Sequence, residues 1–253
     1  MKLPFIKMHA LGNDYVYIDC LSRKMDSHMA NADLPELARM ISDRHRGVGS
    51  DGLVLILPGQ SADVRMRMFN ADGSEAEMCG NAARCIAKYV YEQGLCGNVL
   101  TLDTLAGVKQ LTLHTNADGG VEQVTVTMGT TLGNPHEVFI VADPDDLDRQ
   151  FDSLCTDARY AGLRAKANIE CVYVLNRKEL RMRVCERGTG ETMACGTGAC
   201  AAAAAAMDKG MTGSQVTVHM RGGNVTVRRD KEGIIYLTGT AAEVFRGVYN
   251  WED

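Results

Sequence analysis

Two cysteines stand in similar sequence contexts in this chain, and both are suited to acid–base chemistry. Cys79-Gly80-Asn81 and Cys195-Gly196-Thr197 each follow a strand-like run and open a stretch typical of a helix. Unpaired N–H groups at a helix start stabilise a thiolate, which lowers the pKa of the thiol. The glycine after each cysteine lets an anion approach the same amides. The pattern predicts two reactive thiols, each beside an anion-binding helix start.

The two cysteine motifs belong to a longer internal repeat. The segment RMFNADGSE at 67–75 matches RVCERGTGE at 183–191 at an offset of 116, and the two cysteines follow at the same offset. GNDYVYI at 12–18 recurs as GNPHEVFI at 133–140, at an offset of 121. Two segments that recur in the same order at nearly equal offsets indicate two similar halves.

Strand and helix patterns predict the same architecture for each half. RMRMF at 65–69 and RMRV at 181–184 alternate with period two, which is typical of half-buried strands. The helical stretches after the two cysteines end near Gly94 and Gly210. Both helices are expected to be central, and the alanines of the second leave room for strands on all sides. We expect an α+β fold of two pseudo-symmetric domains, each a mainly antiparallel sheet wrapped around a central helix.

The repeat also predicts the domain boundaries. The tail EVFRGVYNWED lies beyond the second copy, so we expect it to return to the first half as a strand. The first domain would then span residues 1–117 together with 242–253. The second domain would span residues 118–241, so that each half has the size of a small domain.

Paired thiols suit the inversion of a stereocentre without a cofactor. If the halves face each other about a pseudo-twofold axis, one thiolate removes an α-proton and the other thiol protonates the opposite face. A helix start contributes only about 0.3–2 kcal/mol to a nearby charge, and one positioned acid or base about 10²–10⁴ in rate. Because an α-proton is very weakly acidic, domain closure and water exclusion must add to these effects. The sequence thus predicts an amino-acid epimerase or racemase.

Longer motifs around these residues resemble the diaminopimelate epimerase family from residue 7 to the tail. The resemblance implies an isomerase that inverts the α-carbon of LL-2,6-diaminopimelate to the meso form, in lysine and peptidoglycan precursor biosynthesis. It implies neither pyridoxal phosphate nor a metal ion. A related racemase acting on proline or histidine is the alternative. The motifs are KMHALGNDYVYID at 7–19, DRHRGVGSDG at 43–52, NADGSEAEMCGNAAR at 70–84, GNPH at 133–136, Asn168, and ERGTGETMACGTGAC at 186–200.

The resemblance also implies roles for individual residues. Cys79 and Cys195 would be the acid and base, with His136 and Glu186 tuning the site beside them and Glu186 also contacting substrate. Arg187 would hold the distal carboxylate, a bidentate task that suits guanidinium. The backbone amides of Gly80, Asn81, Gly196 and Thr197 would bind the α-carboxylate. Substrate ammonium and carboxylate groups would receive hydrogen bonds from four asparagines: Asn13, Asn70, Asn134 and Asn168.

Some of these residues also have a simpler structural interpretation. Asn13 and Asn134 each follow glycine, as turn residues do, and Glu186-Arg187 is compatible with a solvated ion pair. Gly52 departs from family members that carry glutamine at this position, which affects only a peripheral substrate contact. Two rival functions remain: a Cys–His nucleophilic enzyme, which leaves the second cysteine unexplained, and a non-catalytic amino-acid-binding protein.

Other motifs do not fit their usual structural contexts. GVGSDG at 47–52 matches the dinucleotide-binding pattern, but the strand-like LVLIL follows it where that pattern requires a helix. His136-Glu137 does not begin a metalloprotease H-E-x-x-H motif, because residue 140 is Ile. The spacing of the cysteines does not suit a structural zinc site. No metal site is therefore expected.

Composition limits the classes of binding partner and the cellular compartment that we expect. The formal net charge is −5 without a run of basic residues, which argues against a nucleic-acid partner. The longest apolar run, at 199–207, is far shorter than the roughly 20 residues of a membrane span, and no signal peptide is evident. Nine cysteines, an odd number, favour a reducing cytoplasm. We expect a cytoplasmic homodimer with a small amino-acid substrate and no membrane contact. Buried structural roles are expected for Cys20, Cys171 and Cys185.

Overall fold

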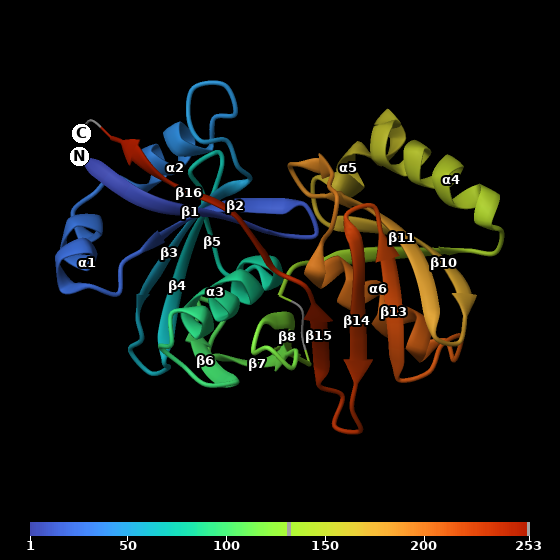
Figure 1. Cartoon of the computed structure of the whole chain (residues 1–253). Coiled ribbons are helices and arrows are strands. Elements are labelled where there is room, and N and C mark those ends of the chain that lie inside the picture. The colour runs from blue at the N-terminus through green and yellow to red at the C-terminus, as the bar shows by residue number, and fades with distance from the viewer. Residues whose placement is uncertain (131–132, 252–253) are drawn as a thin grey trace. The chain divides into compact units, whose positions relative to one another are not determined.

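The computed structural model describes residues 1–130 and 133–251 and divides into two compact units (Figure 1). The first unit comprises Met1–Val126 and Thr240–Asp253, and the second comprises Thr127–Gly239. No helix in the described part of the chain combines the length and apolar character that a membrane crossing requires.

The unit boundaries differ slightly from those expected from the repeat, which were residues 117 and 242. β8 (Val121–Gly129) pairs antiparallel with β7 (Lys109–Thr115), and this pairing extends to Val126. The ladder therefore carries the first unit beyond residue 117. Residues 252–253, the end of the expected returning strand, lie outside the described residues.

The first unit is a mainly antiparallel sheet around helix α3 (Gly80–Glu92). Its strand order is β16-β1-β2-β3-β4-β6-β7-β8, in which only β2–β3 and β4–β6 are parallel, and β5 pairs with the end of β4. Two further helices complete this unit. The remaining elements are β1 (Lys2–Ala10), β2 (Asn13–Asp19), α1 (Arg23–Ala30), α2 (Leu34–Ser42), β3 (Gly52–Pro58), β4 (Val64–Asn70), β5 (Glu75–Ala76), β6 (Val99–Asp103) and β16 (Ala242–Asn250).

The second unit repeats this arrangement around helix α6 (Gly196–Asp208). Its strand order is β15-β14-β13-β11-β10-β9, in which β9–β10 and β11–β13 are parallel. The short β12 pairs with the end of β11, as β5 does with β4. The remaining elements are β9 (His136–Val141), α4 (Pro144–Thr156), η1 (Ala158–Tyr160), α5 (Ala161–Arg164), β10 (Asn168–Asn176), β11 (Glu179–Glu186), β12 (Gly190–Glu191), β13 (Gln215–Met220), β14 (Gly223–Arg229) and β15 (Ile235–Gly239).

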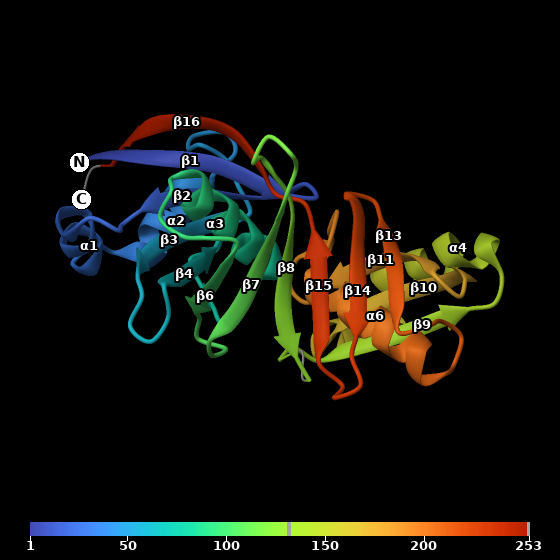
Figure 2. The same cartoon turned by 60° about the horizontal axis from the view of Figure 1, so that its bottom comes forward.

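The C-terminal tail forms β16, which runs antiparallel to β1 in the first unit. Figure 2 shows the two strands side by side along most of their length. The register begins with Lys2 opposite Asn250 and ends with His9 opposite Ala242. The first unit is therefore closed by the last strand of the chain, so residues from both ends build one sheet.

Each sheet is covered on its second face by a helix other than the central one. In the first unit, Leu37 and Ile41 of α2 belong to a buried cluster with Leu53 and Leu55 of β3. β3 is buried on both faces, which explains its continuous apolar sequence. In the second unit, α4 packs on β10 and β11 through a corresponding cluster. Its members are Val141, Leu147, Phe151, Leu154, Ile169, Cys171 and Cys185.

Both central helices end where the sequence predicts. Gly94 and Gly210 follow the last turns with φ of 70° and 67°, in the left-handed region that glycine adopts without strain. The amide of Leu95 donates to the carbonyl of Val90, and that of Met211 donates to the carbonyl of Ala206. These bonds satisfy carbonyls that the helix leaves unpaired, so the two stops are equivalent.

The three cysteines expected to have structural roles are buried. Cys20 and Cys171 are 0% exposed and Cys185 is 3% exposed. Burial raises the pKa of Cys20 to about 12 and that of Cys171 to about 11. The sulfur of Cys185 lies 2.7 Å from that of Cys155 on α4. These thiols therefore pack between the sheet and the covering helices.

Gly52 begins β3 at a place where the fold leaves no room for a side chain. A Cβ atom there would lie 2.1 Å from the carbonyl oxygen of Phe69 and 3.0 Å from the ring of Tyr15. We expect Gly52→Ala to lower the free energy of unfolding by about 1–3 kcal/mol, the usual cost of overpacking. Urea unfolding followed by circular dichroism measures this. Gly97→Ala is the matched control, because no atom lies within 4 Å of its Cβ position; equal losses in both variants would contradict the prediction.

Candidate active site

The two cysteines of the repeat occupy the same position in the two units. Cys79 is the N-cap residue of α3 and Cys195 is the N-cap residue of α6, both with extended backbone. In each unit the short second strand of the hairpin, β5 or β12, leads directly to the cysteine. Both thiols therefore sit at a helix start, as the sequence predicts.

Asn13 is the centre of the hydrogen-bond network around Cys79. Its Oδ1 accepts a bond of 2.9 Å from Nδ2 of Asn81 and one of 3.7 Å from Sγ of Cys79. Its Nδ2 donates to Oδ2 of Asp51 at 2.7 Å. Asn13 is thus more than a turn residue, because its amide joins the thiol to the first turn of α3 and to Asp51.

Charged side chains contact Asp51, the hydrogen-bond partner of Asn13, and the neighbouring Asp14. Arg44 donates to Asp14 at 2.8 Å and to Asp51 at 3.0 Å, and Lys7 forms an ion pair with Asp14 at 2.5 Å. Burial raises the pKa of Asp14, but the bonds from Arg44 and Lys7 outweigh it and lower the pKa overall. Sequence reasoning missed Asp51 and Arg44 as site residues, although both lie in the segment 43–52 that carried the family resemblance.

Arg84 fixes the first turn of α3 from inside the unit. The residue is fully buried, and its guanidinium donates to Oδ1 of Asn81 at 2.7 Å and to the carbonyl of Gly80 at 3.3 Å. It also donates to the carbonyl of Thr240 at 3.3 Å. A buried cation directly beneath the helix start adds positive charge where an anion is expected to bind.

Around Cys195 the polar contacts come mainly from its own helix. The amide of Gly198 donates to Sγ of Cys195 at 3.4 Å, and Oγ1 of Thr197 lies 3.5 Å from the same sulfur. Cys195 is 6% exposed. The thiol is therefore held in the first turn of α6 and is almost completely buried.

The expected fall in the pKa of a thiol at a helix start is wrong for Cys195. Burial raises the pKa of Cys195 well above its ordinary value, and the charges of Glu186 and Glu170 raise it further. The contacts with Thr197 and Gly198 lower it but do not compensate. A helix start is worth about 0.3–2 kcal/mol, whereas full burial can shift a pKa by several units. Cys195 therefore rests as a thiol.

Asn168 and Glu186 organise the end of β11. Oδ1 of the buried Asn168 accepts a bond of 2.8 Å from the backbone amide of Arg187. Glu186 accepts a bond of 2.5 Å from Oγ1 of Thr192, across the turn that leads to β12. The side chain of Arg187 is exposed. The backbone that carries Glu186 and Arg187 is thus fixed, while the guanidinium is accessible.

Two predicted asparagines lie outside these networks in the described structure. Asn70 ends β4, and its Nδ2 donates to Oγ of Ser74 at 2.9 Å, within its own turn. Asn134 is exposed and precedes His136 at the start of β9.

Glu170 is a polar residue of this region that sequence reasoning missed. It is 0% exposed, and its Oε1 lies 2.8 Å from Nδ1 of His136. The signal was present in the sequence, because a glutamate interrupts the apolar strand run at 168–174. Among the residues that the structure describes, no group of His, Cys, Asp or Glu side chains forms a candidate metal site.

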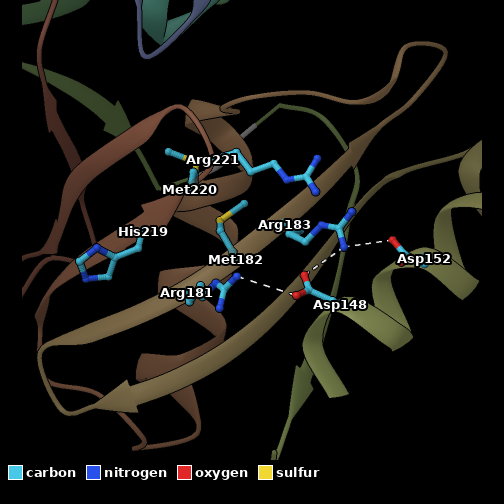
Figure 3. Close-up of a pocket in the computed structure, with 8 residues that line it drawn as sticks. All are labelled: Asp148, Asp152, Arg181, Met182, Arg183, His219, Met220 and Arg221. Carbon is cyan, nitrogen blue, oxygen red and sulfur yellow. Dashed lines mark hydrogen bonds and ion pairs between the residues drawn. The ribbon is translucent and has the colours of Figure 1, made fainter. Parts of the chain in front are cut away.

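A separate hollow on the second unit is a structural ion-pair network. Figure 3 shows Arg183 pointing toward Asp148 and Asp152 of α4. Arg183 forms ion pairs of 3.0 Å with each of them, and one of 2.9 Å with Glu191. Arg221 also binds Glu191, at 2.9 Å. Because these charges are matched, the network serves to hold α4 against β11.

The raised pKa of Cys195 predicts how its reactivity responds to its neighbours. Replacing Glu186 by Gln removes a nearby negative charge, which lowers the pKa of the thiol and increases its thiolate fraction at a given pH. We expect alkylation of Cys195 by iodoacetamide at pH 8 to become about 3- to 10-fold faster, equivalent to roughly half to one pKa unit. Peptide mass spectrometry measures the rate.

The matched control for this measurement is Glu232→Gln, which makes the same change in an exposed turn of the same unit. It should leave the alkylation rate of Cys195 unchanged. An equal rate in wild type and Glu186→Gln would show that the carboxylate does not act on the thiol.

Comparison with known proteins agrees with the duplicated architecture. The family model for diaminopimelate epimerase matches twice, at residues 5–132 and 130–244. The diaminopimelate epimerase of Pelotomaculum thermopropionicum is 42% identical, over 98% of this chain and 99% of that protein. That of Desulfovibrio desulfuricans is 43% identical, again over 98% and 99%.

Solved structures of other proteins share the fold at low sequence identity. A PhzF-family phenazine biosynthesis protein from Bacillus anthracis superposes with a TM-score of 0.70 at 18% identity, over 98% of this chain and 99% of that chain. A probable proline racemase from Agrobacterium radiobacter gives a TM-score of 0.69 at 16% identity, over 97% and 92%. These likenesses show the fold, whereas the family model and the full-length relatives show the family. The chain belongs to the diaminopimelate epimerase family.

Proposed function

We propose that this protein converts LL-2,6-diaminopimelate to meso-diaminopimelate, as an isomerase of lysine and peptidoglycan precursor biosynthesis. The observation that carries the proposal is the pair of cysteines at equivalent helix starts in a chain of this family. Inversion of a carbon needs a base on one face and an acid on the other. Two thiols meet that need, whereas a nucleophilic mechanism uses only one of them.

The proposed proton transfers follow from the different surroundings of the two thiols. Because Cys195 rests as a thiol, it donates a proton, and Cys79 acts as the thiolate base. Cys79 takes the α-proton, and the electron pair of the broken C–H bond forms a planar carbanion stabilised by the carboxylate. Cys195 then protonates the opposite face of the carbon. In the reverse direction the two cysteines exchange roles.

The helix starts supply the proposed α-carboxylate site. The backbone amides at Gly80-Asn81 and Gly196-Thr197 begin α3 and α6, where N–H groups have no partner within the helix. Asn13 also binds Cys79 and Asn81, and Asn168 also binds the amide of Arg187. All four asparagines stay in the proposal as direct substrate contacts: Asn13, Asn70, Asn134 and Asn168.

Arg187 is the proposed partner of the distal carboxylate. Arg187 is exposed, and its backbone amide is held by Asn168, so its guanidinium is accessible to a ligand. A planar guanidinium binds carboxylate with two parallel hydrogen bonds. Substrates that lack a distal carboxylate would forgo this interaction.

Neither pyridoxal phosphate nor metal has a step in the proposed mechanism, because the thiols perform both proton transfers. We also place the reaction in the cytoplasm. The nine cysteines form no disulfide in the described structure, and thiol chemistry is best preserved in a reducing compartment.

The substrate assignment predicts a specific response to loss of Arg187. Wild-type enzyme should exchange the α-proton of diaminopimelate for deuterium in D₂O faster than that of lysine, histidine or proline. Arg187→Ala should lower kcat/KM for diaminopimelate by about 10- to 150-fold, the equivalent of a charged hydrogen bond of roughly 1.5–3 kcal/mol. Proton NMR of each amino acid measures the exchange.

Arg181→Ala is the matched control, because Arg181 is an exposed arginine of β11, the strand that Arg187 follows. It should retain wild-type kcat/KM. Cys79→Ser and Cys195→Ser should each abolish inversion. A wild-type preference for an amino acid without a distal carboxylate would refute the substrate, and full inversion by either serine variant would refute the two-thiol mechanism.

A homodimer is proposed from the exposed edge of the first unit. β16 pairs with β1 along one side, and its Val244 and Val248 are 54% and 58% exposed. An edge strand with exposed apolar side chains is suited to pairing with a second copy about a twofold axis. Charges placed there would oppose that association.

Val244→Lys combined with Val248→Lys should therefore convert dimers to monomers in sedimentation velocity at micromolar concentration. The matched control is Val99→Lys, since Val99 is 54% exposed on β6, a different strand of the same unit. A monomeric wild type, or a dimer that survives the double substitution, would contradict this interface.

A further inference from the structure

A buried carboxylate–imidazole pair lies beside the second thiol, and no step described so far uses the carboxylate. β9 and β10 run parallel with His136 opposite Asn168, which brings Glu170, two residues further along β10, within reach of the imidazole. Oε1 of Glu170 lies 2.8 Å from Nδ1 of His136, and the two side chains are 0% and 6% exposed. We propose that Glu170 is a positioning residue that fixes the orientation and the tautomer of His136 for the epimerase reaction.

The position of Glu170 in its strand places it on the side of the central helix. Its neighbours Ile169 and Cys171 belong to the apolar cluster under α4, on the other face of the sheet. Because side chains alternate along a strand, Glu170 projects toward α6. A carboxylate is costly to bury unless it is paired, so an apolar residue would suit this position if only packing were required.

Gly198 brings the pair close to Cys195. A Cβ atom at Gly198 would lie 2.7 Å from Oε1 of Glu170 and 3.4 Å from Sγ of Cys195. The carboxylate and the thiol therefore pack against the same glycine in the first turn of α6. The absence of a side chain at Gly198 is what allows both groups to approach this turn, so Glu170 belongs to the surroundings of the reacting thiol.

Each side chain of the pair has a second polar atom without a hydrogen-bond partner among the described residues. Within the described structure, Oε2 of Glu170 and Nε2 of His136 are buried and accept or donate no hydrogen bond. Native proteins rarely leave buried polar atoms in this state without a functional reason. In a purely structural ion pair, these two atoms would also have hydrogen-bond partners. Their unpaired state fits a hydrogen-bond partner that arrives with the substrate, or a proton transferred during the reaction.

The carboxylate determines which ring nitrogen of His136 can accept a hydrogen bond or a proton. A carboxylate on Nδ1 accepts the Nδ1–H bond and leaves Nε2 with a lone pair, so that Nε2 can accept a hydrogen bond or a proton. In its ionised form Glu170 would stabilise an imidazolium formed by proton transfer to Nε2. Burial raises the pKa of Glu170, and the bond from His136 reduces this rise without cancelling it.

The other titratable groups near the pair all bear negative charge when ionised. Glu137 on β9 and Glu186 on β11 raise the pKa of Glu170, and Cys195 on α6 is affected by both Glu170 and Glu186. Removal of these groups must be compared with removal of Glu170, whose Oε1 is hydrogen-bonded to Nδ1 of His136.

The test is Glu170→Gln, which keeps the size of the side chain and removes its charge. Two-bond nitrogen–proton NMR of the histidine rings, with His136 assigned by His136→Gln, reports the tautomer without substrate. We expect wild-type His136 to carry its proton on Nδ1. Glu170→Gln should increase the population with the proton on Nε2, because a neutral amide holds Nδ1–H less strongly than a carboxylate and can itself donate to Nδ1. We expect kcat for diaminopimelate to fall about 10- to 100-fold with little change in KM.

Two further variants keep the test decisive. Glu170→Asp retains the carboxylate and should restore most of the wild-type tautomer of His136, even where Glu170→Gln folds poorly. Glu137→Gln removes an exposed carboxylate next to His136 and should leave tautomer and kcat close to wild type. An unchanged His136 tautomer in Glu170→Gln, or an unchanged kcat, overturns the inference.

The inference rests on the proposed function only for its kinetic readout. If wild-type protein has no activity on diaminopimelate but Glu170→Gln changes the tautomer of His136, the proposed substrate is wrong and the role of Glu170 in fixing the imidazole stands. If the enzyme is active but His136 does not respond to Glu170→Gln, the proposed function stands and the positioning role is wrong.

Discussion

Each unit depends on burying the first turn of a helix inside a sheet. A helix start carries N–H groups without partners, and in water these groups would be solvated and their partial charge screened. Here the sheet surrounds α3 and α6, and Gly80, Asn81, Gly196 and Gly198 are all buried. The unpaired N–H groups of this buried turn require an anion or another hydrogen-bond acceptor. The turn is therefore suited to bind an anionic ligand.

Burying these helices constrains their side chains in different ways. α6 consists largely of alanine and glycine, so strands can approach it on every side without displacing bulky groups. α3 carries larger residues and places Arg84, fully buried, directly beneath its first turn. The first helix start is thus reinforced by a cation, whereas Glu170 and Glu186 add negative charge near the second. Two halves built from one pattern have acquired opposite electrostatic surroundings.

The proposed two-thiol reaction depends on this asymmetry. A single inversion requires one protonated and one deprotonated sulfur. Identical surroundings would not determine which of the two cysteines carries the proton. Burial and two carboxylates keep Cys195 protonated. Around Cys79 the contacts are made by the amides of Asn13 and Asn81, with the charged groups Asp51, Arg44 and Arg84 one step away. In this proposal, residues that the repeat does not share, such as Arg84 and Glu170, therefore distinguish the two thiols.

The sequence by itself determined the duplication, the position of both helix starts and stops, and the mainly antiparallel strands, because these follow from local signals repeated at a constant offset. Only the tertiary structure decided the protonation of Cys195, the burial of Arg84 and the pairing of Glu170 with His136. Those properties arise from desolvation and from contacts between residues such as Asn13 and Asp51 that lie far apart in the chain. The secondary-structure propensity of a segment contains no information about which charged residues, distant in sequence, will be buried in contact with one another.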